Sequence, residues 1–141
     1  MIRTLLVAAS LYCSAVATAS GADLTVTIGG ARNANGALAL AVFNSESSFP
    51  RVPLAFASAR IRAAQRNASF TFHNLPPGKY AVSAYHDEND NGKLDTDAVG
   101  FPTEGFGFSN DARGTLGPPE FAKAAFELGE EKKSVTVKVS Y

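Results

Sequence analysis

The sequence predicts an all-β protein: an antiparallel β-sandwich of about seven strands with one long ordered loop. Three observations support this fold class. Short segments alternate apolar and polar residues with the period of two that is typical of half-buried strands, and turns rich in glycine, proline and asparagine separate them. No segment shows the period of an amphipathic helix that would cover a parallel sheet. The 141 residues suffice for one hydrophobic core, so we expect a single domain.

Residues 1–22 are expected to form a secretory signal peptide. Arg3 supplies the positive charge, an apolar run follows at residues 5–16, and small residues precede two candidate cleavage points, after Ala19 and after Ala22. The apolar run is shorter than the roughly 20 residues that a membrane-spanning helix needs. The pattern therefore predicts an exported protein, periplasmic or secreted, with no membrane insertion after cleavage.

The mature chain, residues 23–141, is expected to be one sandwich domain without cysteine. Cys13 is the only cysteine and lies in the leader. Disulfides, thiolate metal sites and a cysteine nucleophile are therefore excluded after cleavage. The fold must then rest on its apolar core.

The first three expected strands differ in how many faces they bury. Residues 23–28 alternate between apolar and threonine side chains, as a half-buried strand does. Residues 37–43 are apolar on both faces, which is typical of a central strand, and the Asn-Gly turn before them favours a hairpin. Residues 58–64 place Ile61 inward, with Arg60 and the arginine that follows Ile61 pointing outward.

Four further strands complete the expected set. Residues 70–73 alternate phenylalanine with polar side chains, and the Pro-Pro-Gly turn after them ends the strand because proline cannot donate to a ladder. Residues 80–86 are apolar on both faces, and residues 122–128 are mostly apolar. Residues 134–141 alternate almost ideally, with three valines and Tyr141 on one side.

The segment LPPGKYAVSAYHD resembles the penultimate hairpin of transthyretin-like and carboxypeptidase-regulatory-like sandwiches. In those folds a proline-glycine turn precedes a strand that begins with tyrosine. The resemblance implies a sandwich of the transthyretin-like or immunoglobulin-like kind, and it implies no functional residue.

Charge is unevenly distributed in the mature chain. Residues 87–120 carry eight acidic residues against two basic ones, whereas the rest of the mature chain has ten basic residues against five acidic ones. The stretch HDENDNGKLDTD, residues 86–97, contains five carboxylates and two asparagine amides. Such carboxylates repel one another by about 1 kcal/mol per pair even in water, and a bound divalent cation would relieve the repulsion.

Residues 87–97, the acidic loop, have the spacing of a calcium-binding loop. Alternate side chains converge on one ion when the backbone curls around it, and a glycine at the sixth position allows the sharp turn. The expected Ca²⁺ ligands at positions 1, 3, 5, 7 and 9 are Asp87, Asn89, Asn91, the Lys93 backbone carbonyl and Asp95, with Gly92 at position 6. The alternative is a solvated turn held by local hydrogen bonds from side chains to the backbone.

Position 12 departs from the EF-hand pattern, because Ala98 stands where a bidentate glutamate is required. The spacing instead resembles the DxNxNGxxD loops of secreted β-sandwich repeats, in which strands flank the ion. The missing carboxylate then has two candidates: Asp97, or Glu104 after a chain reversal at Gly100.

Residues 99–121, the Phe/Gly-rich segment, contain four phenylalanines and five glycines. A long loop inside a compact domain is usually functional or disordered, and apolar rings oppose disorder. We therefore expect Phe101, Phe106 and Phe108 to dock on the sandwich as a lid. An unknown ligand or protein is the expected partner at this segment.

Three motifs in this region, YHDxNxNGKLD, GFPxEGFGFSN and GPPxF, are similar to one family. Together with the leader, the size and the terminal strand, they resemble the uncharacterised bacterial family catalogued as domain of unknown function 2141. The resemblance covers essentially the whole mature chain. It implies a small exported sandwich protein with no established reaction, and it supplies no catalytic residue.

A binding role is preferred to catalysis. Two histidines without an HExxH spacing do not predict a zinc site, and Ser109 lacks the following glycine of a nucleophile elbow. The alternative is a hydrolase-like enzyme that uses His86 and Glu104 at the loop. A second alternative is a small outer-membrane barrel, which the exposed arginines and proline-rich turns oppose. A chain of zero formal net charge that is exported is a poor partner for nucleic acid.

Overall fold

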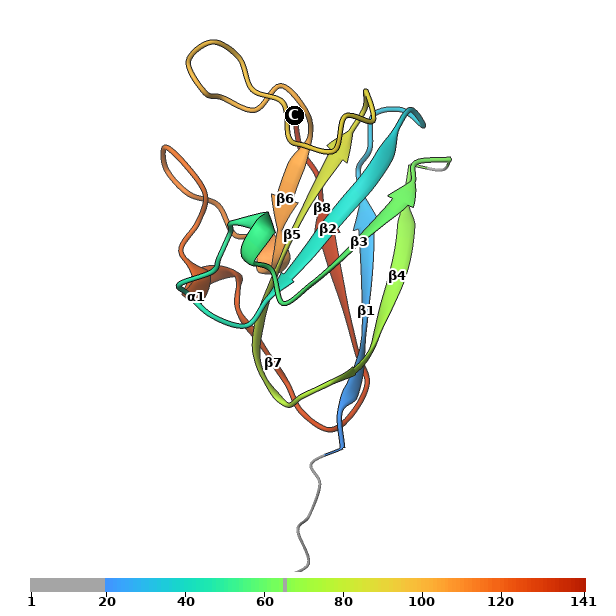
Figure 1. The fold of residues 1–141 in the computed structure, drawn as a ribbon, viewed down its shortest axis with the longest axis vertical. Helices are drawn as coiled ribbons and strands as arrows, with labels where there is room; N and C mark the ends of the chain where they lie inside the picture. The colour runs from blue at the N-terminus through green and yellow to red at the C-terminus, as the bar shows by residue number, and fades with distance from the viewer. Residues whose placement is uncertain (1–19, 65) are drawn as a thin grey trace, which may run out of the picture.

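The computed structural model describes residues 20–64 and 66–141 and shows two β-sheets packed face to face (Figure 1). The all-β sandwich predicted from the sequence is confirmed. Nearly all of the expected signal peptide, residues 1–19, lies outside the described part of the chain. The described strands are β1 (Ala22–Gly29), β2 (Ala37–Phe43), β3 (Ala57–Arg62), β4 (Ala68–Leu75), β5 (Gly78–Asp87), β6 (Phe106–Phe108), β7 (Phe126–Leu128) and β8 (Lys133–Lys138).

Three short helices connect the strands: η1 (Val52–Leu54), η2 (Ser109–Asp111) and α1 (Phe121–Ala124). η1 belongs to the connection that runs over the outside of the larger sheet, whereas η2 and α1 belong to the segment that follows β6 at the side of the sandwich (Figure 1). None of the helices in the described residues has the length and apolar character needed to cross a membrane.

The smaller sheet has the strand order β4-β1-β8, and the larger sheet has the order β3-β2-β5-β6, with β7 paired to the beginning of β5. The sheets are antiparallel except for β1 and β8, which pair in parallel. The reason is visible in Figure 1, where β7 descends along β5 and the following turn reverses the chain into the other sheet. As a result β8 runs in the same direction as β1.

The main core lies between the sheets. The alternating β1 side chains Leu24, Val26 and Ile28 are fully buried there, together with Leu38 of β2 and Val82 of β5. Burying a side chain of this size stabilises the fold by about 1.5–3 kcal/mol. The period of two in β1 is therefore the pattern of a strand with one face in the core.

A second, smaller core explains why β2 and β5 are apolar on both faces. On the outer face of the larger sheet, Phe43 packs with Phe49, Phe108 and Ala124. The Phe49 ring meets the Phe43 ring edge-on at 5.4 Å and the Phe108 ring at 5.6 Å between centroids. The connecting segments therefore cover the sheet that the sequence marks as central.

Several details of the prediction are wrong. Residues 122–128 are not one strand, because α1 takes their first half and only β7 pairs with β5. The terminal strand ends at Lys138, since the last residues leave β1 and Ser140 bridges to Phe106 of β6. β6 itself was not expected, because three residues within a glycine-rich segment are too few to show a strand period. Phe101 does not dock and remains 58% exposed.

Candidate functional site

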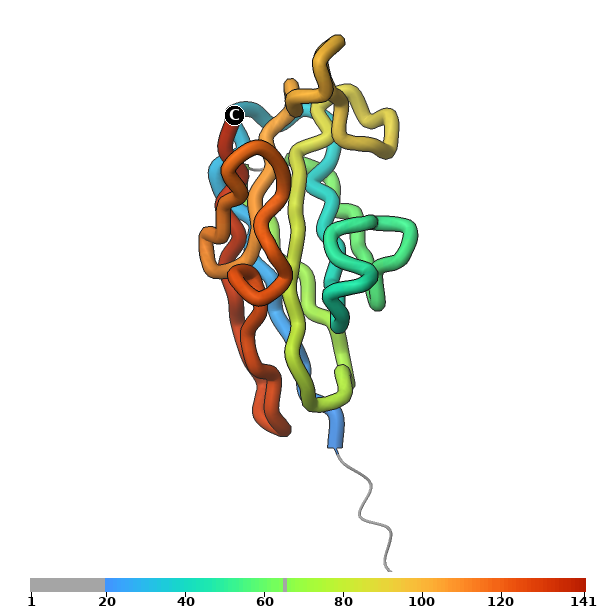
Figure 2. The backbone as a smooth tube through the Cα atoms, turned by 90° about the vertical axis from the view of Figure 1, so that its left-hand side faces the viewer, coloured from blue at the N-terminus to red at the C-terminus, as the bar shows by residue number. Residues whose placement is uncertain are grey.

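The acidic loop projects from the end of β5, at the same end of the molecule as the β1–β2 turn and the last residue of the chain (Figures 1 and 2). Its first residue, Asp87, is fully buried and pairs with Ala37 at the start of β2. The residue before Ala37, Gly36, has a φ of +66°, and a Cβ there would lie 1.9 Å from the Asp87 carbonyl oxygen. Glycine is therefore required where the two strands meet at the base of the loop.

The Asp87 carboxylate holds the loop in its curled shape. Its Oδ1 accepts a hydrogen bond from the Asn91 amide at 3.0 Å, and its Oδ2 accepts one from the Gly92 amide at 2.7 Å. Gly92 has a φ of +85°, which a glycine adopts without strain. The backbone thus turns around the carboxylate of position 1 at positions 5 and 6, as the spacing predicted.

Three of the predicted ligand side chains meet. Asn91 Nδ2 donates to Asp95 Oδ1 at 2.7 Å, and Asn89 Nδ2 donates to the other oxygen of the same carboxylate. The oxygens of the two amides accept from the backbone amides of Asn91 and Lys93. A half-turn of each amide would exchange its nitrogen for its oxygen beside Asp95. The cluster therefore brings one carboxylate and two amide groups together.

The remaining predicted ligands lie in other arrangements. Lys93 follows the Gly92 turn, and its amide donates to Asn91 Oδ1 at 3.2 Å. Asp97 caps the next turn, where its Oδ1 accepts from the amides of Val99 at 2.9 Å and Phe101 at 3.0 Å. Asp97 therefore serves the neighbouring turn rather than the cluster at Asp95.

Glu104 joins the two ends of the acidic loop. It is buried, its Oε1 accepts from the Glu88 amide at 2.9 Å, and its Oε2 accepts from the Asp95 amide at 3.0 Å. Of the two candidates for the missing carboxylate, Glu104 is the one that the fold brings to the base of the loop.

Arg60 contacts the acidic loop, which the sequence did not predict. From β3 it reaches across β2 and places Nη2 2.5 Å from Asp87 Oδ2, and it also pairs with Asp90. Burial raises the pKa of Asp87, but the hydrogen bonds from Arg60, Gly92 and Asn91 outweigh it and leave that pKa below its ordinary value. The signal in the sequence was the excess of basic residues outside the acidic stretch.

A second arginine pairs with the loop from the β1–β2 turn. Arg32 Nη2 lies 2.7 Å from Glu88 Oε1, and Asn33 Nδ2 donates to Glu88 Oε2 at 2.8 Å. Burial raises the pKa of Glu88, but the hydrogen bonds from Asn33 and Arg32 outweigh burial, so the net shift is downward. The charges of Asp87 and Glu88 are therefore partly neutralised by arginines from β3 and from the β1–β2 turn.

His86 is fully buried and both of its ring nitrogens are engaged. Nδ1 lies 2.6 Å from the Tyr141 hydroxyl, and Nε2 lies 2.7 Å from the Asn35 carbonyl oxygen. The carbonyl can only accept, so Nε2 donates to it, and Nδ1 shares a hydrogen bond with the tyrosine hydroxyl. His86 in this position ties three chain segments together.

The residues of the loop fit Ca²⁺ by donor chemistry, which consists of carboxylate and amide oxygens. Within residues 20–64 and 66–141, no three His, Cys, Asp or Glu side chains lie close enough together to hold a metal ion. Any Ca²⁺ shell in the loop must therefore combine Asp95 with asparagine amides, the backbone and Asp87 or Glu104.

A family model described as "Uncharacterized protein conserved in bacteria (DUF2141)" matches residues 26–136. This span contains all of the acidic loop and all of the Phe/Gly-rich segment. Neither the curated proteins nor the solved structures include a match to the chain.

Proposed function

The chain belongs to the uncharacterised bacterial family DUF2141, and for this member we propose a small exported, non-enzymatic β-sandwich protein whose acidic loop binds Ca²⁺. In this proposal the ion orders the loop and the Phe/Gly-rich segment that follows it. That segment then receives a ligand or partner.

The observation that carries the proposal is the convergence of Asn89, Asn91 and Asp95 around one point. Turn propensity alone explains an Asp- and Asn-rich sequence, but it does not require the side chains at positions 3, 5 and 9 to meet. They meet here through hydrogen bonds to both Asp95 oxygens. Oxygen donors from alternate residues of a curled backbone are the ligand set that Ca²⁺ takes.

The affinity expected for the loop is low. Calcium affinity rises with the number of charged ligands and with the rigidity of the site. Asp87 is already neutralised by Arg60, and two of the converging side chains are neutral amides. A dissociation constant of about 10⁻⁴ to 10⁻³ M, the range of extracellular calcium modules, is the reasonable expectation.

The geometry at His86 supports the non-enzymatic proposal over a hydrolase that uses His86 and Glu104. A general base needs an exposed nitrogen within reach of substrate, and His86 is fully buried with both nitrogens bonded. Glu104 uses both carboxylate oxygens to bind loop amides. A broad hydrolase screen would support the hydrolase alternative if it detected a wild-type activity that His86→Ala and Glu104→Ala abolish.

Export is supported by where the fold begins. β1 starts at Ala22, which is buried. Cleavage after Ala19 keeps the whole strand, whereas cleavage after Ala22 removes its first residue. Mass spectrometry of the protein recovered from the periplasm and the medium tests both the cleavage and the site, and an intact leader on all recovered protein would refute it.

Calorimetric titration of mature protein with Ca²⁺ is the direct test of the proposal. Wild type should bind with about millimolar or better affinity, and Asp95→Ala should weaken binding by at least about ten-fold. Glu131→Ala, an exposed acid outside the loop, is the matched control and should bind as wild type does. Asp97→Ala and Glu104→Gln then identify the completing carboxylate. If Ca²⁺ produced neither heat of binding nor a shift in the melting temperature of wild type, the proposal would be refuted.

A further inference from the structure

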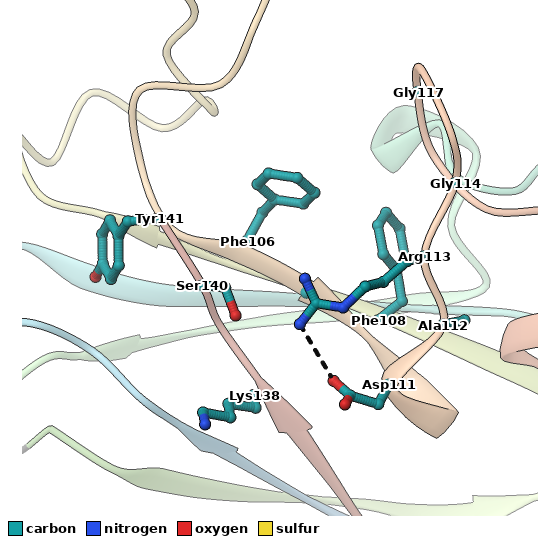
Figure 3. Close-up of a pocket in the computed structure, with 11 residues that line it drawn as sticks. Phe106, Phe108, Asp111, Ala112, Arg113, Gly114, Gly117, Lys138, Ser140 and Tyr141 are labelled. Atoms are coloured by element: carbon teal, nitrogen blue, oxygen red, sulfur yellow. Dashed lines mark ion pairs between the residues drawn. The ribbon is translucent and has the colours of Figure 1, made fainter.

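A pocket of about 200 Å³ lies beside the Phe/Gly-rich segment, away from the residues of the acidic loop (Figure 3). Its wall is formed by β6, by the end of β8 with the residues that follow it, and by the loop at residues 111–117. The aromatic and charged residues that line it are Phe106, Phe108, Asp111, Arg113, Lys138 and Tyr141. The pocket therefore combines aromatic rings with two cations.

The cations are not neutralised within the pocket. Arg113 Nη2 stands 3.9 Å from Asp111 Oδ1, and both side chains are largely exposed, so this ion pair is weak. Lys138 forms no ion pair with any residue in the described part of the chain. Figure 3 shows the Arg113 guanidinium reaching over the pocket toward Ser140, whereas the Lys138 side chain extends away from it, beyond the backbone that carries Ser140. Arg113 is therefore the cation that faces the pocket, and the lining as a whole carries two positive groups against one acid, which favours an anion.

The aromatic side of the pocket is exposed to water. The Phe106 ring is 36% exposed and lies 6.2 Å from the Phe108 ring, between centroids, in an edge contact. The Tyr141 ring is also exposed and stands at the far end of the pocket in Figure 3. Flat apolar rings of this kind bind other rings by stacking or edge contacts.

The wall that carries Arg113 is held in a strained shape. Asn110 and Asp111 are consecutive residues with φ of 58° and 52°, a left-handed conformation that costs up to about 1–2 kcal/mol and that Asn and Asp tolerate better than other residues with side chains. Asn110 Nδ2 fixes this shape by donating to the carbonyls of Lys123 at 3.2 Å and Ala125 at 2.8 Å. Strain maintained by dedicated hydrogen bonds is concentrated at binding sites.

Leu116 lies in the loop between Gly114 and Gly117, which line the pocket, and is 90% exposed. A Cβ on Gly114 would lie 2.0 Å from the Gly117 carbonyl oxygen, so the loop is a tight turn that presents Leu116 outward. An apolar side chain in this position gains free energy when it covers an apolar ligand.

We infer that this pocket binds a small aromatic monocarboxylate, with the ring against Phe106, the carboxylate on the Arg113 guanidinium and Lys138 adding positive charge at the rim. The pocket is smaller than the roughly 300–1,000 Å³ typical of drug-sized ligands, which restricts the ligand to a single ring with a short acidic chain. The inference gives a chemical class to the partner of the Phe/Gly-rich segment. It rests on the proposed function only in treating the chain as a binding protein, and it does not require Ca²⁺.

The test is an NMR titration of ¹⁵N-labelled mature protein with phenylacetate, in the presence of either EDTA or Ca²⁺. Saturable amide shifts should appear at residues 106–117 and 138–141, with a dissociation constant of about 1 mM or below. Acetate and inorganic phosphate test the anion alone, and 2-phenylethanol tests the ring alone. Each should bind at least about ten-fold more weakly than phenylacetate.

Two charge variants decide the roles of the cations. The double variant Arg113→Gln, Lys138→Gln should lower phenylacetate affinity by at least about ten-fold. The double variant Lys79→Gln, Lys132→Gln removes the same charge from exposed positions outside the pocket and should bind as wild type does. Phe106→Leu keeps an apolar side chain without the ring and should also weaken binding.

Four results would overturn the inference: no saturable shift with phenylacetate in either buffer, equal binding of phosphate or acetate, equal binding of phenylethanol, or equal loss in the two double variants. Binding in EDTA together with failed Ca²⁺ titrations would refute the calcium loop and leave the pocket standing. Calcium binding without phenylacetate binding would refute the pocket inference and leave the calcium proposal standing.

Discussion

Replacing Arg60 by glutamine separates two accounts of the acidic loop. In the first account the loop needs no metal ion, because Arg60 pairs with both Asp87 and Asp90 and Arg32 pairs with Glu88. In the second account Arg60 shares the loop with Ca²⁺ and opposes the ion by charge repulsion and by holding Asp87. The first account predicts that Ca²⁺ leaves the stability of the Arg60→Gln variant unchanged. The second account predicts that Ca²⁺ stabilises it.

The size of the effect follows from burial. Asp87 is fully buried, whereas the Arg60 side chain is 36% exposed. Arg60→Gln leaves the buried carboxylate with the amides of Asn91 and Gly92, so it loses one charged partner and keeps two neutral ones. Loss of a charged partner from a buried group costs about 1–3 kcal/mol, and the exposure of Arg60 places this case at about 1–2 kcal/mol. In EDTA the melting temperature should fall by about 4–8 °C.

Calcium should then reverse the loss. Removing a positive charge a few ångströms from a divalent ion relieves about 1–2 kcal/mol of repulsion at the dielectric constant of water. The variant should therefore bind Ca²⁺ about five- to thirty-fold more tightly than wild type. Differential scanning fluorimetry with increasing Ca²⁺, checked by calorimetric titration, measures both quantities.

Arg62→Gln is the matched control for this experiment. Arg62 lies two residues further along β3 on the same exposed face and forms no ion pair in the residues that the structure describes. It should change neither stability nor Ca²⁺ response by a comparable amount. If Arg60→Gln melts as wild type does in EDTA, the electrostatic account of Asp87 is wrong. If Ca²⁺ stabilises neither protein, the loop is held by its arginines without a metal ion.

Three further predictions follow from single contacts. The pKa of Asp87 in the folded state lies below its ordinary value of 3.8. The ionised carboxylate therefore contributes its full stability above pH 3.8, and this stability is lost as the pH falls through the folded pKa. Asp87→Asn should flatten the pH dependence of the unfolding free energy below about pH 4. Tyr141→Phe removes the hydroxyl that serves buried His86 and should cost about 1–3 kcal/mol in denaturant unfolding; an unchanged midpoint would contradict that. Gly36→Ala should lower the free energy of unfolding by more than about 3 kcal/mol or prevent folding, because its Cβ would overlap the Asp87 carbonyl. Gly100→Ala is the control: its Cβ would lie in open space, and the free energy of unfolding should fall by only about 1–2 kcal/mol.

Much of the sandwich was predictable because the apolar residues of its core strands show which faces of each strand are buried. β1 alternates since one face is buried, and β2 is apolar throughout since a second core covers its outer face. β6 and the short helix α1 were not predictable. Their residues become strand and helix only where the folded sheet offers an edge or a groove, which no local pattern records.

The acidic loop was predictable in part. Spacing alone indicated that the side chains of Asn89, Asn91 and Asp95 converge and that Gly92 makes the turn, because these are consequences of local backbone geometry. Glu104 was one of two candidates for the missing carboxylate, and the spacing did not decide between it and Asp97. The contact of Arg60 with the loop was not predictable. Arg60 reaches Asp87 only because β3 pairs with β2 and β2 with β5, and such a register is not readable from one strand.

Strand β5 explains why the acidic loop and the pocket occur in one small domain. Its last residue, Asp87, anchors the loop, and its outer neighbour β6 forms a wall of the pocket. The short stretch from Glu104 to Phe106 joins the two, since Glu104 closes the loop and the Gly105 carbonyl accepts the His86 amide at 2.8 Å. A central strand that is covered on both faces is rigid, and rigidity is what a ligand-binding loop and an adjacent pocket both require of their support. The apolar pattern of residues 80–86 is therefore the feature on which both sites depend.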